Sequence, residues 1–166
     1  MAAQTILEFC HGQPEKSFAA GAVIVQEGDP SDGSLWILVS GVAEVLKHGT
    51  VCIATIREPG ATIGEMALLV GRPFSATVRA ATTVRCLCIP DGMAFLLANP
   101  PVLLAIAGLL AERLFAASAY LADVKRQYQD SGTSLAMLDE ILESLILHPG
   151  ESRAEPGSER AVDPNE

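Results

Sequence analysis

Short apolar segments alternate with turn-forming residues throughout residues 1–90, and this alternation constrains the fold more than any other feature. β-Branched and aromatic residues favour strands, whereas glycine, proline, asparagine and aspartate reverse the chain. The expected strands lie at 22–26, 35–39, 42–47, 51–56, 75–80 and 83–89. Strands that recur about every 8–12 residues predict an antiparallel barrel, sandwich or jelly roll.

After residue 90 the pattern becomes helical. Asp91 is placed to cap a short helix at 92–97, and Asn99, followed by two prolines, opens a longer helix that runs to about Tyr128. Apolar residues of the longer helix recur near helical spacing at Leu103, Ile106, Leu110, Leu114, Leu121 and Val124. This helix either packs only on the β-rich part or also pairs with its copy. Because its sequence is apolar over more than one face, we expect a homodimer through residues 101–128.

A further amphipathic segment follows a break at 130–133. Its apolar stripe consists of Leu135, Leu138, Ile141, Leu142 and Leu145. Such a stripe either docks on its own domain or binds a partner, so residues 134–147 are a candidate surface for a protein partner. Residues 129–147 are predicted to form a C-terminal helix, and residues 148–166, rich in Glu, Pro, Ser and Gly, a disordered acidic tail.

Acidic residues outnumber basic ones, which argues against nucleic acid as a partner. The chain has 20 Asp and Glu against 11 Lys and Arg, a formal charge of −9 at pH 7. Residues 139–166 carry −6 of this charge, so the rest of the chain is nearly neutral. The negative balance therefore belongs mainly to the predicted tail.

The longest apolar run, at 102–111, is too short to cross a membrane. It has ten residues, whereas a spanning helix needs about 20. The N-terminus has neither the basic region nor the continuous apolar region of a signal peptide. A cytoplasmic protein with no membrane partner is predicted.

The cysteines and histidines do not have the spacing of a metal or catalytic site. Cys86 and Cys88 stand two residues apart in an expected strand and share one face, so buried, reduced, structural thiols are expected. His11, His48 and His148 lie in separate parts of the chain. Because no hydrolase or phosphate-loop motif is present either, the chain is predicted to hold no metal and to be no enzyme.

Residues 63–80 carry the pattern with the most chemistry. Gly64 allows a ligand to approach the backbone closely, and the first amides of a short helix at 65–69 would face an anion. The Glu65 carboxylate can accept hydrogen bonds from sugar hydroxyls. The same residues also suit an ordinary strand–turn–helix connection, and the residues alone leave both interpretations open.

This run, with Glu27-Gly-Asp and the segment from Trp36 to Gly41, resembles the cyclic nucleotide-binding domain family. The family includes domains of cAMP receptor transcription factors, cyclic-nucleotide-gated channels and kinase regulatory subunits. The resemblance covers about residues 10–128. It implies a β-jelly roll flanked by an N-terminal helix and a long C-terminal helix, with the domain at 1–128, the roll at about 16–90 and helices at 91–128. It also implies cAMP or cGMP in the roll, with the long helix as lid and dimer surface.

The resemblance assigns ligand-binding roles to residues of the cassette. By this likeness the amide of Gly64 faces the ligand, Glu65 accepts from the ribose 2′-hydroxyl, and the amide of Ala67 approaches the phosphate. Ser75 and Ala76 match the small pair that follows the family's arginine. The implied ligand-binding residues are Gly64, Glu65, Met66, Ala67, Arg72, Phe74, Ser75, Ala76 and Thr77.

One departure from the family pattern decides the expected affinity. Phe74 stands where the family has the arginine that pairs with the cyclic phosphate. A charge-assisted hydrogen bond contributes about 1.5–3 kcal/mol, so its loss lowers affinity by roughly one or two orders of magnitude. Arg72 restores the charge if it turns inward; otherwise it is solvated and Phe74 fills the pocket.

Two functions therefore remain open at this level. The first is a stand-alone sensor or regulatory module that binds cAMP or cGMP weakly or in an altered way and signals through its C-terminal helices. The second is a degenerate domain without nucleotide binding that acts as a dimeric protein-interaction scaffold. Direct DNA binding is not expected, because the 38 residues after Tyr128 are too few for the effector domain of the family's transcription factors.

Overall fold

The computed structural model describes residues 2–128, so the helix predicted at 129–147 and the tail predicted at 148–166 lie outside the described residues. The chain divides into two compact units, residues 1–111 and residues 112–166. The first unit contains every strand that the structure describes. It therefore holds the whole of the predicted β-rich region and the cassette.

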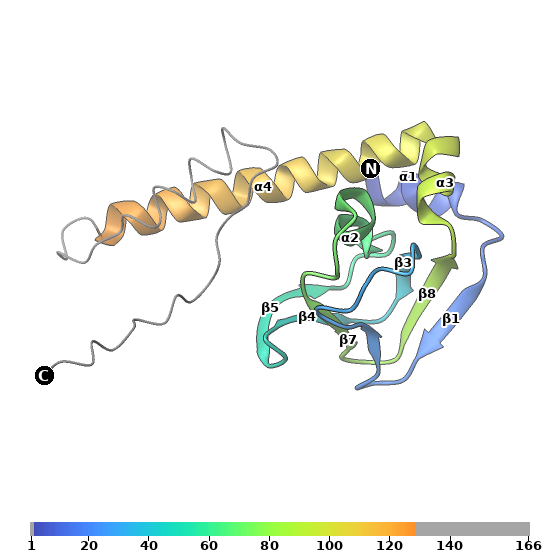
Figure 1. Ribbon diagram of the computed structural model, residues 1–166, viewed down its shortest axis with the longest axis horizontal. Coiled ribbons are helices and arrows are strands. Elements are labelled where there is room, and N and C mark those ends of the chain that lie inside the picture. Colours follow the sequence, from blue (N-terminus) through green and yellow to red (C-terminus); the bar gives the residue numbers. More distant parts are fainter. Residues whose placement is uncertain (1, 129–166) are drawn as a thin grey trace, which may run out of the picture. The chain divides into compact units, whose positions relative to one another are not determined.

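The first unit is built from two four-stranded antiparallel sheets (Figure 1). The first sheet has the order β1-β8-β3-β6 and the second β2-β7-β4-β5. The strands are β1 (Glu15–Phe18), β2 (Val23–Val25), β3 (Leu35–Ser40), β4 (Ala43–Lys47), β5 (Val51–Ile56), β6 (Thr62–Ile63), β7 (Thr77–Ala80) and β8 (Val84–Ile89). This jelly-roll-like arrangement confirms the predicted fold class.

An inner core lies between the two sheets. Trp36 and Leu38 of β3 face Val78 of β7 and Ala43 of β4 across it, and Phe18 packs edge-on against Trp36 with 5.4 Å between ring centroids. Side chains alternate between the two faces of a strand. The same alternation sends Leu35 and Ile37 to the opposite face of the first sheet, which explains why β3 is an unbroken apolar run.

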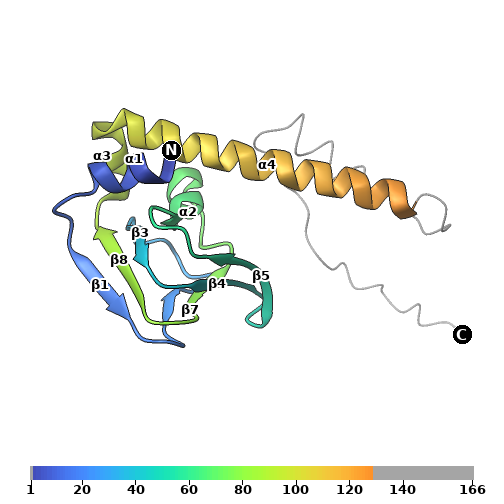
Figure 2. The ribbon, with the colours of Figure 1, turned by 180° about the vertical axis from the view of Figure 1, so that it is seen from behind.

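A helix-side core covers that opposite face. It joins Leu35, Ile37 and Ile89 to Ile6, Cys10, Leu96, Val102 and Ile106. The helices are α1 (Ala2–Phe9), α3 (Gly92–Ala98) and α4 (Pro100–Tyr128), and Figures 1 and 2 show α1, α3 and the start of α4 gathered at one end of the strands. The predicted caps are confirmed in part: the Asp91 carboxylate accepts a hydrogen bond from Ala94 N at 3.0 Å.

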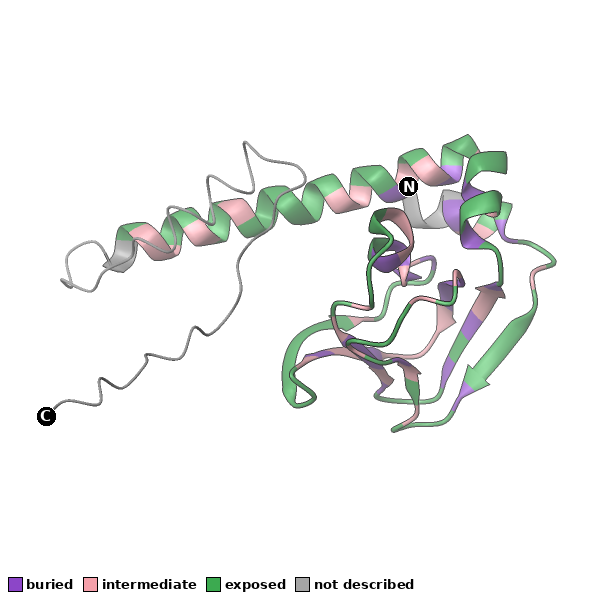
Figure 3. Cartoon of the chain, in the orientation of Figure 1, coloured by how far each residue is buried: buried purple, intermediate pink, exposed green. Residues whose placement is uncertain are grey.

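Two strands of the first sheet, β1 and β6, were not predicted, because both lack an apolar pattern. β1 reads Glu-Lys-Ser-Phe with only Phe18 buried, and β6 has two residues. β1 is held by pairing with β8 and by the Glu15–Arg85 ion pair, neither of which is visible in a local pattern. Figure 3 shows most of β1 as exposed.

Of the two thiols expected to be buried, Cys86 is buried and Cys88 is half-buried; Cys10 is buried as well, whereas Cys52 is exposed. Burial raises the pKa of the Cys10 and Cys86 thiols to about 11 in each case. Cys52 is exposed because β5 is the edge strand of the second sheet and all but its last residue face solvent (Figure 3). A strand-like sequence does not reveal whether the strand lies at an edge.

Helix α4 is more apolar than its ten-residue run suggested. By length and composition alone, Pro100–Arg126 is long and apolar enough to cross a membrane, with a mean hydropathy of 1.8 over the best window. Mostly buried core helices of soluble proteins pass the same test, but only 11% of this window is buried, with Val102 and Ile106 in the helix-side core. A single such helix is weak evidence for a membrane span.

Candidate functional site

The cassette, residues 64–77, connects β6 to β7 and contains the short helix α2 (Glu65–Val70). Glycines close both ends of the helix in the left-handed conformation, Gly64 with φ 93° and Gly71 with φ 65°. Such φ values are strained for any residue with a Cβ. The predicted helix at 65–69 is confirmed, and the two glycines set where it begins and ends.

Phe74 packs directly on Gly64. A Cβ added to Gly64 would lie 3.4 Å from Phe74 Cε1 and 3.4 Å from the carbonyl oxygen of Ser34, so the cassette glycine is covered by an aromatic ring. Phe74 is half-buried and packs against the inner core. Its backbone is held on both sides, since Phe74 N donates to Asp29 O at 3.0 Å and Gly28 N donates to Phe74 O at 2.9 Å. These two bonds direct the residue-74 side chain toward the cassette glycine.

Arg72 is placed differently from Phe74. Its side chain is exposed, and its guanidinium has no hydrogen-bond or ion-pair partner within the part of the chain that the structure describes. The backbone N of Arg72 donates to Ala67 O at 3.2 Å, which completes the turn after α2. In this structure Arg72 is exposed, and the half-buried Phe74 lies against Gly64.

The start of α2 combines a buried carboxylate with a small residue. Glu65 is 4% exposed and Ala67 5% exposed, whereas Met66 is about half exposed. Carboxylates are rarely buried without a partner. Among the side chains that the structure describes, no fully buried nitrogen or oxygen lacks a hydrogen-bond partner. Glu65 is therefore a satisfied buried acid at the position that the resemblance assigns to the ribose.

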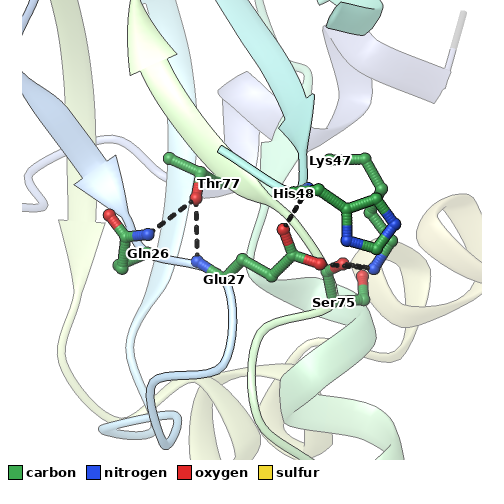
Figure 4. Close-up of polar contacts among 6 residues, drawn as sticks. All are labelled: Gln26, Glu27, Lys47, His48, Ser75 and Thr77. Carbon is green, nitrogen blue, oxygen red and sulfur yellow. Dashed lines mark hydrogen bonds and ion pairs between the residues drawn. The ribbon is translucent and has the colours of Figure 1, made fainter. Parts of the chain in front are cut away.

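The end of the cassette returns into the sheet. Ser75 is exposed, Ala76 is half-buried and Thr77 is buried. Thr77 Oγ1 accepts hydrogen bonds from Gln26 Nε2 and from the backbone N of Glu27, both at 3.0 Å (Figure 4). Thr77 therefore ties the cassette to the segment that follows β2, which is a structural role.

An ion pair that no sequence pattern predicted lies beside the cassette. Lys47 Nζ donates to Glu27 Oε1 at 2.7 Å and also to the carbonyl oxygen of Ser75 (Figure 4). His48 N donates to Glu27 Oε2 at 2.7 Å. The hydrogen bond from Lys47 lowers the pKa of the Glu27 carboxyl, and the bond from His48 N acts in the same direction. A lysine that ends an apolar strand is the only local signal for this pair.

The described residues hold no group of three His, Cys, Asp or Glu side chains able to bind a metal ion. The polar groups at the cassette are instead a carboxylate, an ammonium, hydroxyls and backbone amides. This set suits a ligand with hydroxyls and one negative charge.

Residues 15–96 match the family described as "Cyclic nucleotide-binding domain". A cyclic nucleotide-gated potassium channel of Mesorhizobium japonicum is 39% identical over 84 residues, which are 51% of this chain and 22% of the channel. A cAMP-dependent protein kinase regulatory subunit of Emericella nidulans is 41% identical over 68 residues, which are 41% of this chain and 16% of the subunit. The chain thus spans less than a quarter of the length of either relative.

The fold is also similar to that of solved structures. The catabolite activator protein of Thermus thermophilus superposes with a TM-score of 0.60 at 25% identity, covering 75% of this chain and 59% of that one. The family match at residues 15–96 includes the cassette. Residues 15–96 of this chain therefore form a cyclic nucleotide-binding domain.

Proposed function

We propose that the chain is a sensor or regulatory module that binds cAMP or cGMP at the cassette with weakened affinity. The observation that carries the proposal is the start of α2, where left-handed Gly64 is followed by buried Glu65 and Ala67 in the order that the family uses. Relatives named for cyclic nucleotides support the ligand class. Cyclic nucleotide-binding domains are regulatory, so the chain is proposed to have no catalytic activity and to need no metal.

Phe74 sets the proposed affinity. Its ring lies over Gly64, in the direction that an arginine at this position would follow. The ring offers no hydrogen bond and no charge to a phosphate. We therefore expect binding at least tenfold weaker than in a variant that carries arginine at position 74.

Signalling is proposed to pass from α2 through α3 to α4. Leu68 of α2 packs tightly on Gly92, the first residue of α3, where an added Cβ would lie 2.6 Å from Leu68 Cδ2. Only Asn99 separates α3 from α4. A ligand that binds more tightly to one position of α2 therefore raises the population of that position, and the contacts of α2 pass the change to α3 and α4.

The second candidate function is a dimeric scaffold without a ligand, which the Phe74 ring over Gly64 favours. Both functions include the proposed homodimer through residues 101–128, where Leu104, Phe115 and Tyr120 are exposed apolar side chains. Both also include a protein partner at residues 134–147 and a cytoplasmic location, with no nucleic acid and no membrane as partners. These partner and location assignments are proposals.

Calorimetric titration of cAMP and cGMP into the wild type and Phe74→Arg separates the two functions. If the chain is a sensor, the wild type binds the nucleotide. Phe74→Arg then binds it at least tenfold more tightly, because the restored guanidinium points to the cassette glycine. A scaffold shows no heat with the wild type. If Phe74→Arg is also silent although it is folded, the cassette is not a nucleotide site and the sensor proposal is wrong.

A further inference from the structure

Lys47 is the last residue of β4, the strand that pairs with β7 directly after the cassette. Ala43 and Val45 of the same strand pack into the inner core, whereas Glu44, between them, forms an ion pair with Arg79 at 2.9 Å. Because side chains alternate along a strand, Lys47 shares the inner face with Ala43 and Val45. Arg79 belongs with Glu44 on the opposite face. Lys47 therefore brings a positive charge to the face that lines the roll.

The hairpin turn after β4 holds Lys47 in this place. His48 and Gly49 have φ values of 53° and 76°, and Thr50 N donates to Lys47 O at 3.3 Å. Positive φ at both central residues is the requirement of a tight type I′ turn. The backbone at Lys47 is thus fixed by the turn, while the paired side chain is 40% exposed.

The contacts of the ammonium group bring it to the cassette. Lys47 Nζ donates to the carbonyl oxygen of Ser75, one residue after Phe74, and to Glu27 at 2.7 Å. Glu27 is anchored by His48 N, and its side chain is 21% exposed. An ammonium has three donors, so Lys47 can keep its bond to Ser75 and exchange the carboxylate for another anion.

We propose that Lys47 is the cation that pairs with the cyclic phosphate in this protein, and that Glu27 is an internal counter-ion competing for it. This inference rests on the proposed nucleotide-binding function. A cyclic nucleotide carries one negative charge on its phosphodiester, which exchanges with the Glu27 carboxylate at the ammonium. The competing carboxylate lowers the affinity that the lysine provides.

Four substitutions test this assignment by titration with cAMP and cGMP. Lys47→Met weakens binding at least tenfold because it removes the charge. Lys47→Arg keeps affinity within about threefold, because the charge remains. Glu27→Gln tightens binding, because an amide leaves the lysine without an anionic competitor. The matched control is Lys16→Met, which removes an exposed ammonium that lies over the rings of Phe18 and Trp36 in the first sheet and leaves affinity unchanged.

The test includes two checks. Thermal unfolding by circular dichroism shows whether each variant is folded, and the effect of Lys47→Met shrinks at high salt if it is electrostatic. The double variant Phe74→Arg with Lys47→Met binds nucleotide, because the guanidinium then supplies the charge. That result shows that the rest of the site survives the loss of Lys47.

Three outcomes would overturn the assignment. If Lys47→Met binds nucleotide as tightly as the wild type, the Lys47 assignment is wrong and the sensor function remains intact. If Arg72→Ala loses affinity and Lys47→Met does not, Arg72 is the cation that pairs with the phosphate. The Lys47 assignment is then wrong, and the sensor function remains intact. Silence of the folded wild type together with binding by Phe74→Arg overturns both the Lys47 assignment and the sensor function.

Discussion

At the scale of single residues, close backbone contacts decide which side chains the chain tolerates. Gly64 is covered by Phe74, and Gly41 faces the backbone that leads into β8, where an added Cβ would lie 2.3 Å from Thr83 O. Both glycines have positive φ. A Cβ at Gly41 would meet rigid backbone, so it has no room to relax.

Gly41→Ala is expected to destabilise the domain by more than about 3 kcal/mol. The left-handed backbone costs an alanine about 1–2 kcal/mol, and the clash with Thr83 O adds to this cost. The matched control is Gly49→Ala, which also has positive φ but has no atom within 4 Å of the new Cβ. Urea unfolding measures both free energies, and equal losses in the two variants would contradict the clash.

At the scale of elements, α4 combines a buried start with exposed apolar side chains. Val102 and Ile106 belong to the helix-side core, whereas Leu104 is 74% and Phe115 80% exposed. Exposed apolar side chains of this size favour burial against a partner. The sequence predicted the helix from its caps and leucine spacing, but the leucines counted as one face are not equally buried, since Leu114 is 44% exposed.

Leu104→Glu and Phe115→Glu are each expected to convert the proposed α4 dimer to a monomer, because each would place a charge in the proposed helix–helix contact. Sedimentation equilibrium at about 100 µM measures the mass, with twice the chain mass of 17.4 kDa expected for the wild type. The control Leu97→Glu, on the exposed side of α3, leaves the dimer intact. A wild type that sediments as a monomer rules out the α4 dimer.

At the scale of the whole molecule, two buried thiols couple folding to pH. Burial raises the pKa of Cys10 and Cys86 to about 11, one in each core. An unfolded cysteine titrates near 8.5, so above that pH the unfolded chain loses thiol protons that the folded chain keeps. The folded state therefore binds more protons, and stability falls as pH rises from about 8.5 to 11.

Each buried thiol is expected to contribute a slope of at most about 1.4 kcal/mol per pH unit in this window. Urea unfolding at a series of pH values from 8 to about 11 measures the total slope. Cys86→Ala should make the slope shallower, although the variant is less stable at every pH because it leaves a small cavity. An unchanged slope in Cys86→Ala would show that the thiol does not keep its proton.

Local pattern determined much of this protein. Turn glycines separated the strands, Asp91 and Asn99 located the helix starts, and the order Gly64-Glu65-Met66-Ala67 marked the cassette. These signals are local because turns, caps and strand alternation depend on residues near one another in the chain. The prediction that Phe74 stands where the family has an arginine is equally local, since it concerns a single residue within a short motif.

Tertiary structure decided the rest. Strand pairing brings β4 beside β7 and places Lys47 next to Ser75, 28 residues away in the chain. The backbone bonds of Phe74 to Gly28 and Asp29 decide that its ring, and not Arg72, covers Gly64. Contacts between residues distant in sequence depend on sheet register and packing, which no local pattern encodes. The cation beside the cassette could therefore be identified only in the folded chain.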